Sequence, residues 1–314
     1  MNKIKIQNRY TDFGTILNYK QKKFVKDFNN KERQFEMVKC LCEGNDFLLI
    51  ADIDRYGLKQ NTVICKRCGL VLSNPRMTEN EYRDFYTEDI YRNIYDPSPD
   101  YENFYKAEND IYKLVSRFKN SVLVLEVGAG GGWNLVPFKG AKGYEYSKSL
   151  VELGRKHGIN IEQGGISDVN GRYDLIILNH VLEHLLNPIE EMKKLSLHLS
   201  EDGIIYIAVP DMKNFAADQI QNAHTYYFNK RTLQYYMSKS GLDMIYSEPV
   251  EEIHLAAIFK KANSNLSENF LSGNYEEQLN IIKKKLEVRP FVRAKRFLRK
   301  TLNTFLVNIN NFKT

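Results

Sequence analysis

Residues 122–133 read VLVLEVGAGGGW, an apolar run that ends in the acid Glu126 and then breaks into a glycine-rich turn. This order is typical of a strand that leads into a nucleotide-binding loop. Nineteen residues after Glu126, the segment 142–146 places a second acid, Glu145, at the end of a second short strand. An acid at that point can bind ribose hydroxyls. The two strands therefore predict a site for a nucleotide-type cofactor.

The first acid narrows the choice of cofactor. A carboxylate just before Gly128 would repel the phosphates of a dinucleotide but would accept hydrogen bonds from the ammonium group of an adenosyl amino acid. The dinucleotide fingerprint also fails, because its last small position, counted from Gly128, falls on Trp133. We therefore expect S-adenosylmethionine, with an unliganded surface turn as the alternative.

Apolar runs of strand length alternate with segments of helical periodicity in the body of the chain. The expected strands lie near 122–127, 142–146, 159–162, 173–178, 204–209, 243–247 and 253–260, and the expected helices span 132–138, 148–157, 188–198 and 230–240. This alternation predicts an α/β fold, a parallel sheet with helices on both faces. Ligands of such sheets lie beyond the carboxyl ends of the strands.

The glycine turn, Glu145 and the segment 173–184, YDLIILNHVLEH, resemble the class I S-adenosylmethionine-dependent methyltransferases over roughly residues 100 to 260. The resemblance implies a Rossmann-like seven-stranded sheet that ends in a reversed hairpin. It also implies the cofactor-binding residues Glu126, Gly128, Gly130, Glu145, Tyr146, Gly165, Ile166, Asn179 and His180. The family often has Asp at the adenine position, which residues 164–166 lack, so adenine would be held by backbone groups, Ile166 or Asp168.

All four cysteines lie in one short region, as the pair Cys40 and Cys42 and the pair Cys65 and Cys68. Two close pairs can supply four thiolates to one tetrahedral zinc ion. No His lies among them, so we expect a closed, structural site, with free buried cysteines as the alternative.

The segments 54–58, 63–71 and 74–78 look like the zinc-binding domain that precedes the methyltransferase domain in enzymes that modify sugars and surface polysaccharides. Those relatives usually have Cys-x-x-Cys in the first half. Here Lys39 stands where their first Cys would be, so Cys40 is the ligand that this departure affects. The resemblance implies a sugar as the methyl acceptor.

Residues 79–120 are rich in tyrosine and contain the turn sequence DPSPD at 96–100. Helices on both sides of this turn could form a lid, because tyrosine combines an apolar ring with a hydroxyl that can bind a polar acceptor. We expect Tyr86, Tyr91 and Tyr95 to contact the acceptor. For most of the tyrosines, packing of the helices against the body is the preferred interpretation.

Two His-bearing segments, 179–184 and 222–228, follow the carboxyl ends of the fourth and fifth strands. Methyl transfer is an in-line displacement at a sulfonium, so the protein must aim the acceptor and remove its proton, and neutral His suits that task. The segment 223–229 resembles the motif that holds the general base in sugar methyltransferases with this zinc domain. That resemblance implies His224 as the base, with His184 second and Tyr227 in the acceptor site, while Ala223 replaces an acid of some relatives. Structural histidines are the alternative.

The run from His180 to His184 literally matches the metalloprotease pattern H-x-x-E-H. That pattern requires both histidines on one face of a long helix, and here it begins where a buried strand ends. We rank a divalent ion at this place low, because methyl transfer itself needs no metal.

Positive charge lies at the two ends of the chain, which has 314 residues and a net charge of +6. Residues 1–38 contain nine Lys or Arg against four acids, and residues 289–314 contain seven against none, so the body is acidic. Such ends could meet an anionic membrane, a diphosphate-bearing substrate or nucleic acid, or could be solvated helix faces. No apolar run reaches the length of a membrane-spanning helix and no secretory signal is present, so we expect a cytoplasmic protein.

The segment 275–288 reads as a charged helix, and residues 291–309 beyond Pro290 draw one apolar stripe against a basic face. Such a helix could lie on the inner face of the membrane, which would suit a lipid-linked acceptor. Packing on the body or on a second subunit is the interpretation that we prefer, and the sequence leaves the oligomeric state open, with a dimer among the options.

We therefore expect transfer of a methyl group from S-adenosylmethionine to a small-molecule, lipid-linked or polymer-linked sugar in surface glycan or nucleotide-sugar synthesis, with O-methylation favoured over C-methylation. An RNA methyltransferase is one alternative. Two observations argue against it: the positive charge lies at the termini, and no amino-methylation motif follows the fourth strand. A non-catalytic cofactor-binding module is the other. The expected domains are a basic arm (1–38), a zinc-binding domain (39–78), a tyrosine-rich lid or linker (79–120), a methyltransferase domain (121–262) and a helical basic tail (263–314).

Overall fold

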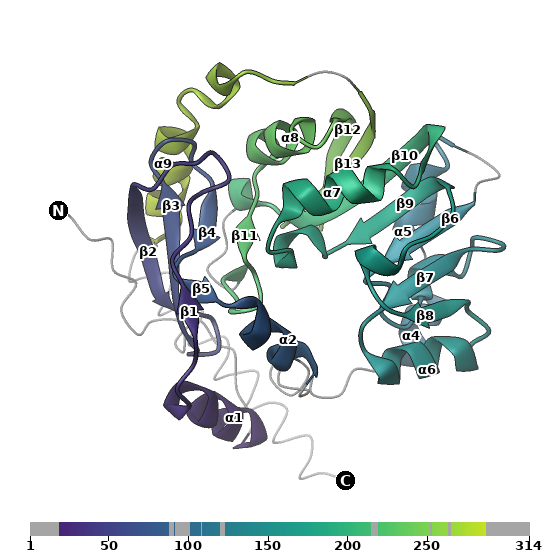
Figure 1. Ribbon diagram of the computed structural model, residues 1–314, viewed down its shortest axis with the longest axis horizontal. Coiled ribbons are helices and arrows are strands. Elements are labelled where there is room, and N and C mark those ends of the chain that lie inside the picture. Colours follow the sequence, from purple (N-terminus) through teal and green to yellow (C-terminus); the bar gives the residue numbers. More distant parts are fainter. Residues whose placement is uncertain are drawn as a thin grey trace, which may run out of the picture.

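A seven-stranded sheet forms the centre of the larger half of the protein (Figure 1). The computed structural model describes residues 19–87, 91, 101–107, 109–119, 123–214, 219–251, 253–262 and 265–286. The strands of this sheet are β6 (Val124–Val127), β7 (Lys142–Glu145), β8 (Ile161–Gln163), β9 (Tyr173–Asn179), β10 (Leu199–Pro210), β12 (Leu242–Val250) and β13 (His254–Lys261). Their spatial order is β12-β13-β10-β9-β6-β7-β8.

Six of the seven strands run in the same direction, and β13 runs antiparallel between β10 and β12. The order reverses at β6, because β7 and β8 extend the sheet on one side of β6 and β9 and β10 extend it on the other. Ligands bind at such a switch point, beyond the carboxyl ends of the strands. This arrangement confirms the predicted α/β sheet with its reversed terminal hairpin.

Helices cover both faces of the sheet because successive residues of a buried strand point to opposite faces. Leu175 and Ile177 of β9 pack against α5 (Asp110–Val115). Ile176 and Leu178 point the other way, into the cluster that contains residues of α7 (Pro188–Ser196) and α8 (Lys230–Ser238). Two further helices are α4 (Tyr101–Lys106) and α6 (Lys148–Lys156).

A four-stranded antiparallel sheet forms the second half of the protein, on the left of Figure 1. It contains β2 (Phe47–Ile53), β3 (Lys59–Cys65), β4 (Val71–Ser73) and β11 (Tyr226–Tyr227), in the order β11-β4-β3-β2. The two-stranded pair β1 (Phe35–Glu36) and β5 (Arg76–Met77) lies nearby, with α1 (Tyr19–Asn30) and α2 (Glu79–Thr87). β11 lies in the second His-bearing segment, so a part of the chain that follows β10 contributes a strand to this N-terminal sheet.

The C-terminal helix α9 (Asn274–Leu286) packs on the four-stranded sheet, where Ile282 contacts the core that contains Ile50 and Ile64. At the start of this helix, the side-chain amide of Asn274 donates a 2.7 Å hydrogen bond to the carbonyl of Cys68. The neighbouring Gly69 has a positive φ, and a Cβ there would lie 2.6 Å from the Asn274 amide nitrogen. The predicted charged helix is therefore present, whereas residues 291–309 lie outside the described part of the chain.

The expected helix at 132–138 is wrong in its extent. Only the 3-10 turn η2 (Trp133–Leu135) forms, since Gly132 precedes it in the left-handed conformation and Pro137, which removes a backbone donor, follows. Within the described residues, the other short helices are η3 (Ile166–Asp168), η4 (Leu182–His184), η5 (Met212–Asn214) and η7 (Glu268–Leu271). Among the helices that the structure describes, none combines the length and the apolar character needed to cross a membrane.

Candidate active site and cysteine cluster

Glu145, the last residue of β7, binds the glycine turn that follows β6. One carboxylate oxygen of Glu145 accepts a 3.0 Å hydrogen bond from the Gly130 amide, and the other accepts a 2.8 Å bond from the Ser147 amide. Gly128 has a φ of 68°, and a Cβ there would lie 2.5 Å from a methyl carbon of Val181. Val181 belongs to the loop after β9, so the turn and that loop are in contact.

Glu126 is buried at the end of β6 with one oxygen left unpaired. Its Oε1 accepts a 2.7 Å hydrogen bond from the Asn134 side chain, while Oε2 has no partner. Burial raises the pKa of this carboxyl to about 8, although the hydrogen bond from Asn134 favours the ionised form and lowers the pKa in part. An unpaired buried carboxylate oxygen fits the ammonium group of an adenosyl amino acid, which would supply the missing donors.

The predicted cofactor-binding residues that follow β7 and β8 also lie close together. Tyr146, which follows β7, leans on Gly165, and a Cβ at Gly165 would lie 2.0 Å from the Tyr146 hydroxyl. Ile166 is buried beside them. Asp168 accepts a 2.8 Å hydrogen bond from the Gly165 amide, so this carboxylate holds its own loop.

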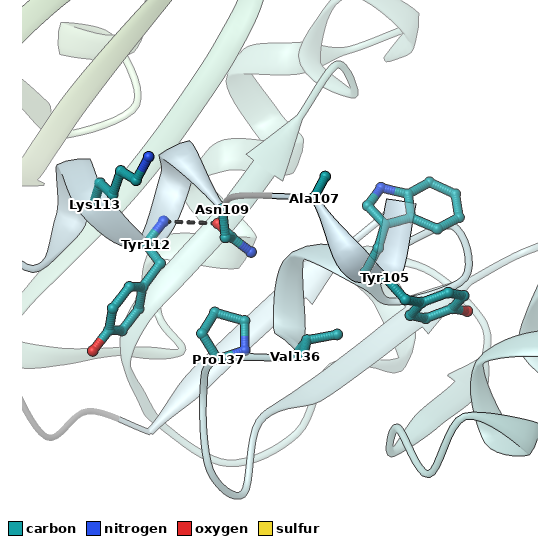
Figure 2. Close-up of a pocket in the computed structure, with 8 residues that line it drawn as sticks. Tyr105, Ala107, Asn109, Tyr112, Lys113, Val136 and Pro137 are labelled. Carbon is teal, nitrogen blue, oxygen red and sulfur yellow. Dashed lines mark hydrogen bonds between the residues drawn. The ribbon is translucent and has the colours of Figure 1, made fainter. Parts of the chain in front are cut away.

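Aromatic side chains of α4 cover the outer side of the glycine turn. Tyr101 stacks on Trp133 with ring centroids 5.9 Å apart, and the Tyr105 hydroxyl donates a 2.6 Å hydrogen bond to the Gly131 carbonyl. Figure 2 shows the neighbouring pocket of about 290 Å³ between α4, α5 and the turn after η2. None of the predicted catalytic or cofactor-binding residues lines this pocket, which lies outside the proposed site.

The two predicted catalytic histidines face one another. The rings of His184 and His224 lie 4.9 Å apart and nearly perpendicular. Nδ1 of His184 lies 3.0 Å from the carbonyl oxygen of Ala223 and 2.9 Å from the Tyr86 hydroxyl. Because a carbonyl oxygen only accepts, the first contact assigns a proton to Nδ1 and leaves Nε2 of His184 as an acceptor.

His224 is almost completely buried, and its Nδ1 has no hydrogen-bond partner. Burial, together with the neighbouring His184, lowers the pKa of His224 to about 3, so the imidazole is neutral near pH 7. Next to this pair, Oε1 of the buried Glu183 lies 3.3 Å from Nδ1 of His180, while its Oε2 has no partner. The site therefore combines two imidazoles with a carboxylate, and two of the three side chains carry an unpaired atom.

The loop that carries Glu183 and His184 departs from helical geometry. Asn179 ends β9, and His180 has a φ of 56°, in the left-handed region that non-glycine residues rarely adopt. Only the 3-10 turn η4 follows. The H-x-x-E-H run therefore does not lie on one long helix. The sequence predicted this departure from the metalloprotease pattern.

The predicted acceptor-binding tyrosines have different surroundings. Tyr86 contacts His184 through its hydroxyl, and the ring of Tyr91 lies 5.1 Å from that of Tyr86. Tyr227 is buried behind His224 and its hydroxyl donates a 3.1 Å bond to the Gln221 carbonyl. Tyr95 lies outside the described residues.

The segment that carries His224 is bound on both sides. The Ser73 hydroxyl in β4 donates a 2.7 Å hydrogen bond to the carbonyl of His224, and the Ser73 amide donates to Thr225. Thr225 in turn donates a 2.8 Å bond from its amide to the carbonyl of Glu183. The N-terminal sheet, the His224 segment and the loop after β9 therefore form one hydrogen-bonded unit.

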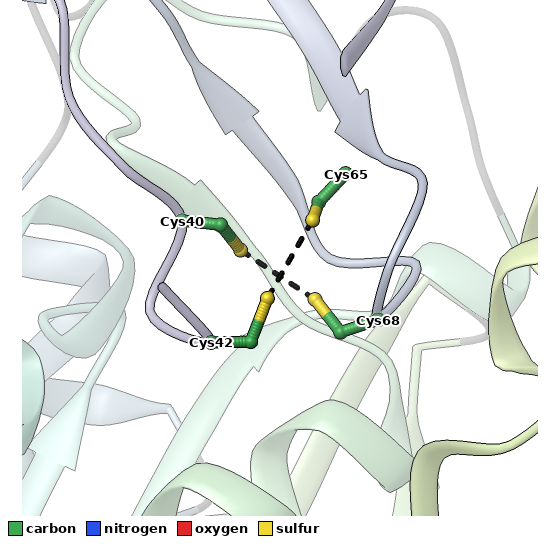
Figure 3. A group of neighbouring side chains, drawn as sticks. All are labelled: Cys40, Cys42, Cys65 and Cys68. Carbon is green, nitrogen blue, oxygen red and sulfur yellow. Dashed lines mark hydrogen bonds between the residues drawn. The ribbon is translucent and has the colours of Figure 1, made fainter. Parts of the chain in front are cut away.

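The four cysteines converge at the edge of the N-terminal sheet (Figure 3). The Sγ atoms of Cys40 and Cys68 lie 3.5 Å apart, and those of Cys42 and Cys65 lie 3.6 Å apart. Four thiolates at roughly 2.3 Å from a tetrahedral zinc ion would lie roughly 3.8 Å from one another. The set therefore has the geometry of a metal site, and Cys40 joins it despite the shortened first pair.

The sequence of this chain is similar to those of known proteins. Residues 100–247 match the family model of a methyltransferase domain. Together with the strand order, this match shows that the chain carries the catalytic domain of a class I S-adenosylmethionine-dependent methyltransferase. An uncharacterized protein of Methanocaldococcus jannaschii is 28% identical over 134 residues, which cover 39% of this chain. The match spans 64% of the length of that relative.

Two solved structures are distantly similar. An S-adenosylmethionine-dependent methyltransferase from Clostridium acetobutylicum is 16% identical, with a TM-score of 0.41, and the match covers 59% of this chain and 100% of that one. The 1,6-didemethyltoxoflavin-N1-methyltransferase of Burkholderia thailandensis is 16% identical, with a TM-score of 0.48, and the match covers 62% and 96%.

Three residues of this site were not predicted from the sequence. Asn134 pairs with Glu126, Ser73 binds the His224 carbonyl, and Glu183 contributes the buried carboxylate. Glu183 stands in the H-x-x-E-H run and could have been found there, whereas Ser73 has no signal in the sequence that connects it to residue 224.

Proposed function

We propose that the protein transfers a methyl group from S-adenosylmethionine to a hydroxyl group of a sugar. The observation that carries this proposal is the placement of an imidazole pair, the buried His224 and the partly buried His184, next to the glycine turn. Val181 contacts Gly128, and His184 follows three residues later on the same loop. Cofactor cradle and proton acceptor therefore share one edge of the sheet, as in-line transfer requires.

Each part of the cofactor has a counterpart in this cradle. Glu126 offers the unpaired oxygen to the ammonium group, Glu145 lies where ribose hydroxyls would bind, and Tyr146 with Ile166 flanks the adenine position. S-adenosylmethionine supplies an electrophilic methyl group on a sulfonium sulfur. His224, supported by His184, accepts the proton of the acceptor hydroxyl.

A sugar acceptor is supported by the resemblance of the cysteine segment and by the tyrosines beside the imidazoles. Tyr86 and Tyr91 place two aromatic rings within 6.3 Å of the His184 ring, measured between centroids. Aromatic rings pack on the apolar faces of sugars while hydroxyl and imidazole groups bind their polar edges. Nucleotide-linked, lipid-linked and polymeric sugars all fit this chemistry.

We also propose that Cys40, Cys42, Cys65 and Cys68 bind a structural zinc ion. The spacing of the four sulfur atoms supports this proposal, and four thiolates would complete the tetrahedral coordination of a structural zinc ion. The Tyr236 hydroxyl donates a 3.2 Å bond to Sγ of Cys68, which is the kind of outer contact that holds a metal ligand in place.

The test is transfer of label from methyl-labelled S-adenosylmethionine into separated nucleotide-sugar, lipid-linked glycan, polymeric glycan and RNA fractions of a cell extract. Wild type is compared with His224→Ala and with the control His198→Ala, a partly exposed histidine whose ring nitrogen contacts the Gly171 carbonyl. We expect label in one sugar fraction, lost in His224→Ala and kept in the control. Label in RNA alone would contradict the sugar assignment.

A further inference from the structure

Three side chains at the carboxyl end of β9 form a group with the composition of a metal site. Glu183, His184 and His224 each offer a ligand atom, and these atoms all lie within 4.8 Å of one another. The group is separate from the four cysteines. It combines two imidazoles with one carboxylate, a set that can bind one face of a metal ion and leave other positions open.

Two atoms of this group are buried without a hydrogen-bond partner. They are Oε2 of Glu183, on a side chain that is 1% exposed, and Nδ1 of His224, on a residue that is 4% exposed. Buried polar atoms are almost always paired, so each unpaired one calls for a ligand or a water. Proton transfer by one imidazole explains neither the second imidazole nor the carboxylate.

Hydrogen bonds to neighbouring residues orient the side chains of His184 and Glu183, as they commonly do for metal ligands. The Ala223 carbonyl accepts the Nδ1 proton of His184, which directs the Nε2 lone pair of this ring away from that contact. Nδ1 of His180 lies 3.3 Å from Oε1 of Glu183 and leaves Oε2 as the remaining oxygen. Histidine ligands commonly donate their other N–H to a carbonyl in this way.

We propose that Glu183, His184 and His224 bind a divalent transition-metal ion. Two imidazoles favour ions such as Mn²⁺, Fe²⁺, Co²⁺ or Zn²⁺ over Mg²⁺ and Ca²⁺, which prefer oxygen ligands alone. The ion would sit on the loop that contacts Gly128 through Val181, and therefore next to the cofactor cradle.

This inference deepens the proposed function, on which its catalytic meaning rests. An open position on the ion would bind the acceptor hydroxyl and lower the pKa of that hydroxyl. The proton would then pass to solvent water, and an oxygen lone pair would form the new bond to the methyl carbon. The bond between this carbon and the sulfonium sulfur breaks at the same time, and its electron pair stays on sulfur, so that S-adenosylhomocysteine leaves. In the ion-bound enzyme, His224 is a ligand, and the ion replaces it as the group that activates the acceptor.

The experiment measures ion binding by the full-length protein without cofactor or acceptor. Protein with its cysteine site filled with zinc is titrated with Co²⁺ and followed by absorption and by metal analysis after gel filtration. We expect one further equivalent of Co²⁺ whose spectrum lacks the sulfur-to-metal bands of thiolate ligation. Glu183→Gln and His224→Gln should weaken its binding at least tenfold, whereas the control His198→Gln should bind as wild type does.

Two measurements keep folding separate from ion binding. The variants should retain one zinc ion per chain and the circular dichroism of wild type, because the Gln side chains keep most of the volume of Glu and His. Wild type that binds no ion beyond the cysteine site would overturn the proposal, as would Gln variants that bind Co²⁺ as tightly as wild type. Since neither cofactor nor acceptor is present, failure of the methyl-transfer assay leaves this result unchanged, and absence of the ion leaves the transferase proposal unchanged.

Discussion

The hydroxyl of Ser73 donates a 2.7 Å hydrogen bond to the backbone carbonyl of His224. Ser73 ends β4, the strand that pairs with β11 immediately after His224. The Gln60 side chain donates to the same hydroxyl. The sheet that carries Cys65 therefore fixes the backbone of the proposed catalytic histidine, although the two lie far apart in the sequence.

Replacement of Ser73 by alanine should slow methyl transfer without weakening cofactor binding. The variant loses two buried hydrogen bonds, the one to the His224 carbonyl and the one from Gln60, each of which contributes about 1 kcal/mol to the folding free energy. The His224 segment can then shift. We expect kcat to fall roughly tenfold, since small displacements of a catalytic group are costly. Ser196→Ala is the control, because Ser196 makes the same kind of bond, to the Lys193 carbonyl, at the surface. Equal kcat values for wild type and Ser73→Ala would contradict this connection.

Cys40→Ser should release the zinc ion that we propose for the cysteine cluster. Cys40 is buried and its Sγ lies 3.5 Å from that of Cys68, so a serine there removes one of four thiolates. Metal analysis should give less than one zinc per chain, and the melting temperature should fall. Lys39→Ala, at the exposed position next to it, should keep the zinc. Full zinc content in Cys40→Ser would show that Cys40 is not a ligand.

Glu126 should make the stability of the cofactor-free protein depend on pH. Burial raises the pKa of this carboxyl to about 8, above the value of about 4.3 that an unfolded chain gives. Between these values the folded state binds the extra proton, so the free energy of unfolding should decrease as pH rises, by up to about 1.4 kcal/mol per pH unit.

The measurement is urea denaturation of wild type and Glu126→Gln at several pH values from 5 to 8. The glutamine variant cannot titrate at this position, so its advantage over wild type should grow with pH. Glu201→Gln, at an exposed position in β10, should follow wild type. Parallel pH profiles for wild type and Glu126→Gln would refute the assignment of a buried, titrating carboxyl.

Tyr86→Phe should impair the acceptor side of the site. The phenylalanine keeps the ring but removes the hydroxyl that lies 2.9 Å from Nδ1 of His184. Loss of one hydrogen bond of this kind predicts a decrease of roughly fivefold in kcat/KM for the acceptor, with unchanged cofactor affinity. Tyr112→Phe, at an exposed position in α5, serves as the matched control. A decrease in both variants would place the effect elsewhere.

The sequence predicted the methyltransferase sheet well because its signals are local. Each buried strand is a short apolar run, and Glu126 and Glu145 mark strand ends next to a glycine turn. Positive φ at Gly128 and Gly130 explains why the turn needs glycine, a requirement that is visible in the residue types themselves.

The features that the sequence did not predict depend on pairings between distant residues. β11 contains only Tyr226 and Tyr227 and joins a sheet whose other strands lie some 150 residues earlier. Two residues have no period that could indicate a strand. The Ser73 bond and the convergence of Glu183 with His224 follow from that pairing, so they become apparent only in the fold.

We propose that the glycine turn binds the cofactor beside the imidazole pair of His184 and His224. The most direct test of this proposal is a calorimetric titration with S-adenosylhomocysteine of wild type, Glu145→Gln and the control Glu152→Gln, an exposed acid on α6. We expect one binding site in wild type and no change of affinity in the control. The affinity of Glu145→Gln should be at least about tenfold lower, because a charged acceptor of the Gly130 amide is lost. Absence of binding to wild type, or equal affinity in all three proteins, would contradict this proposal.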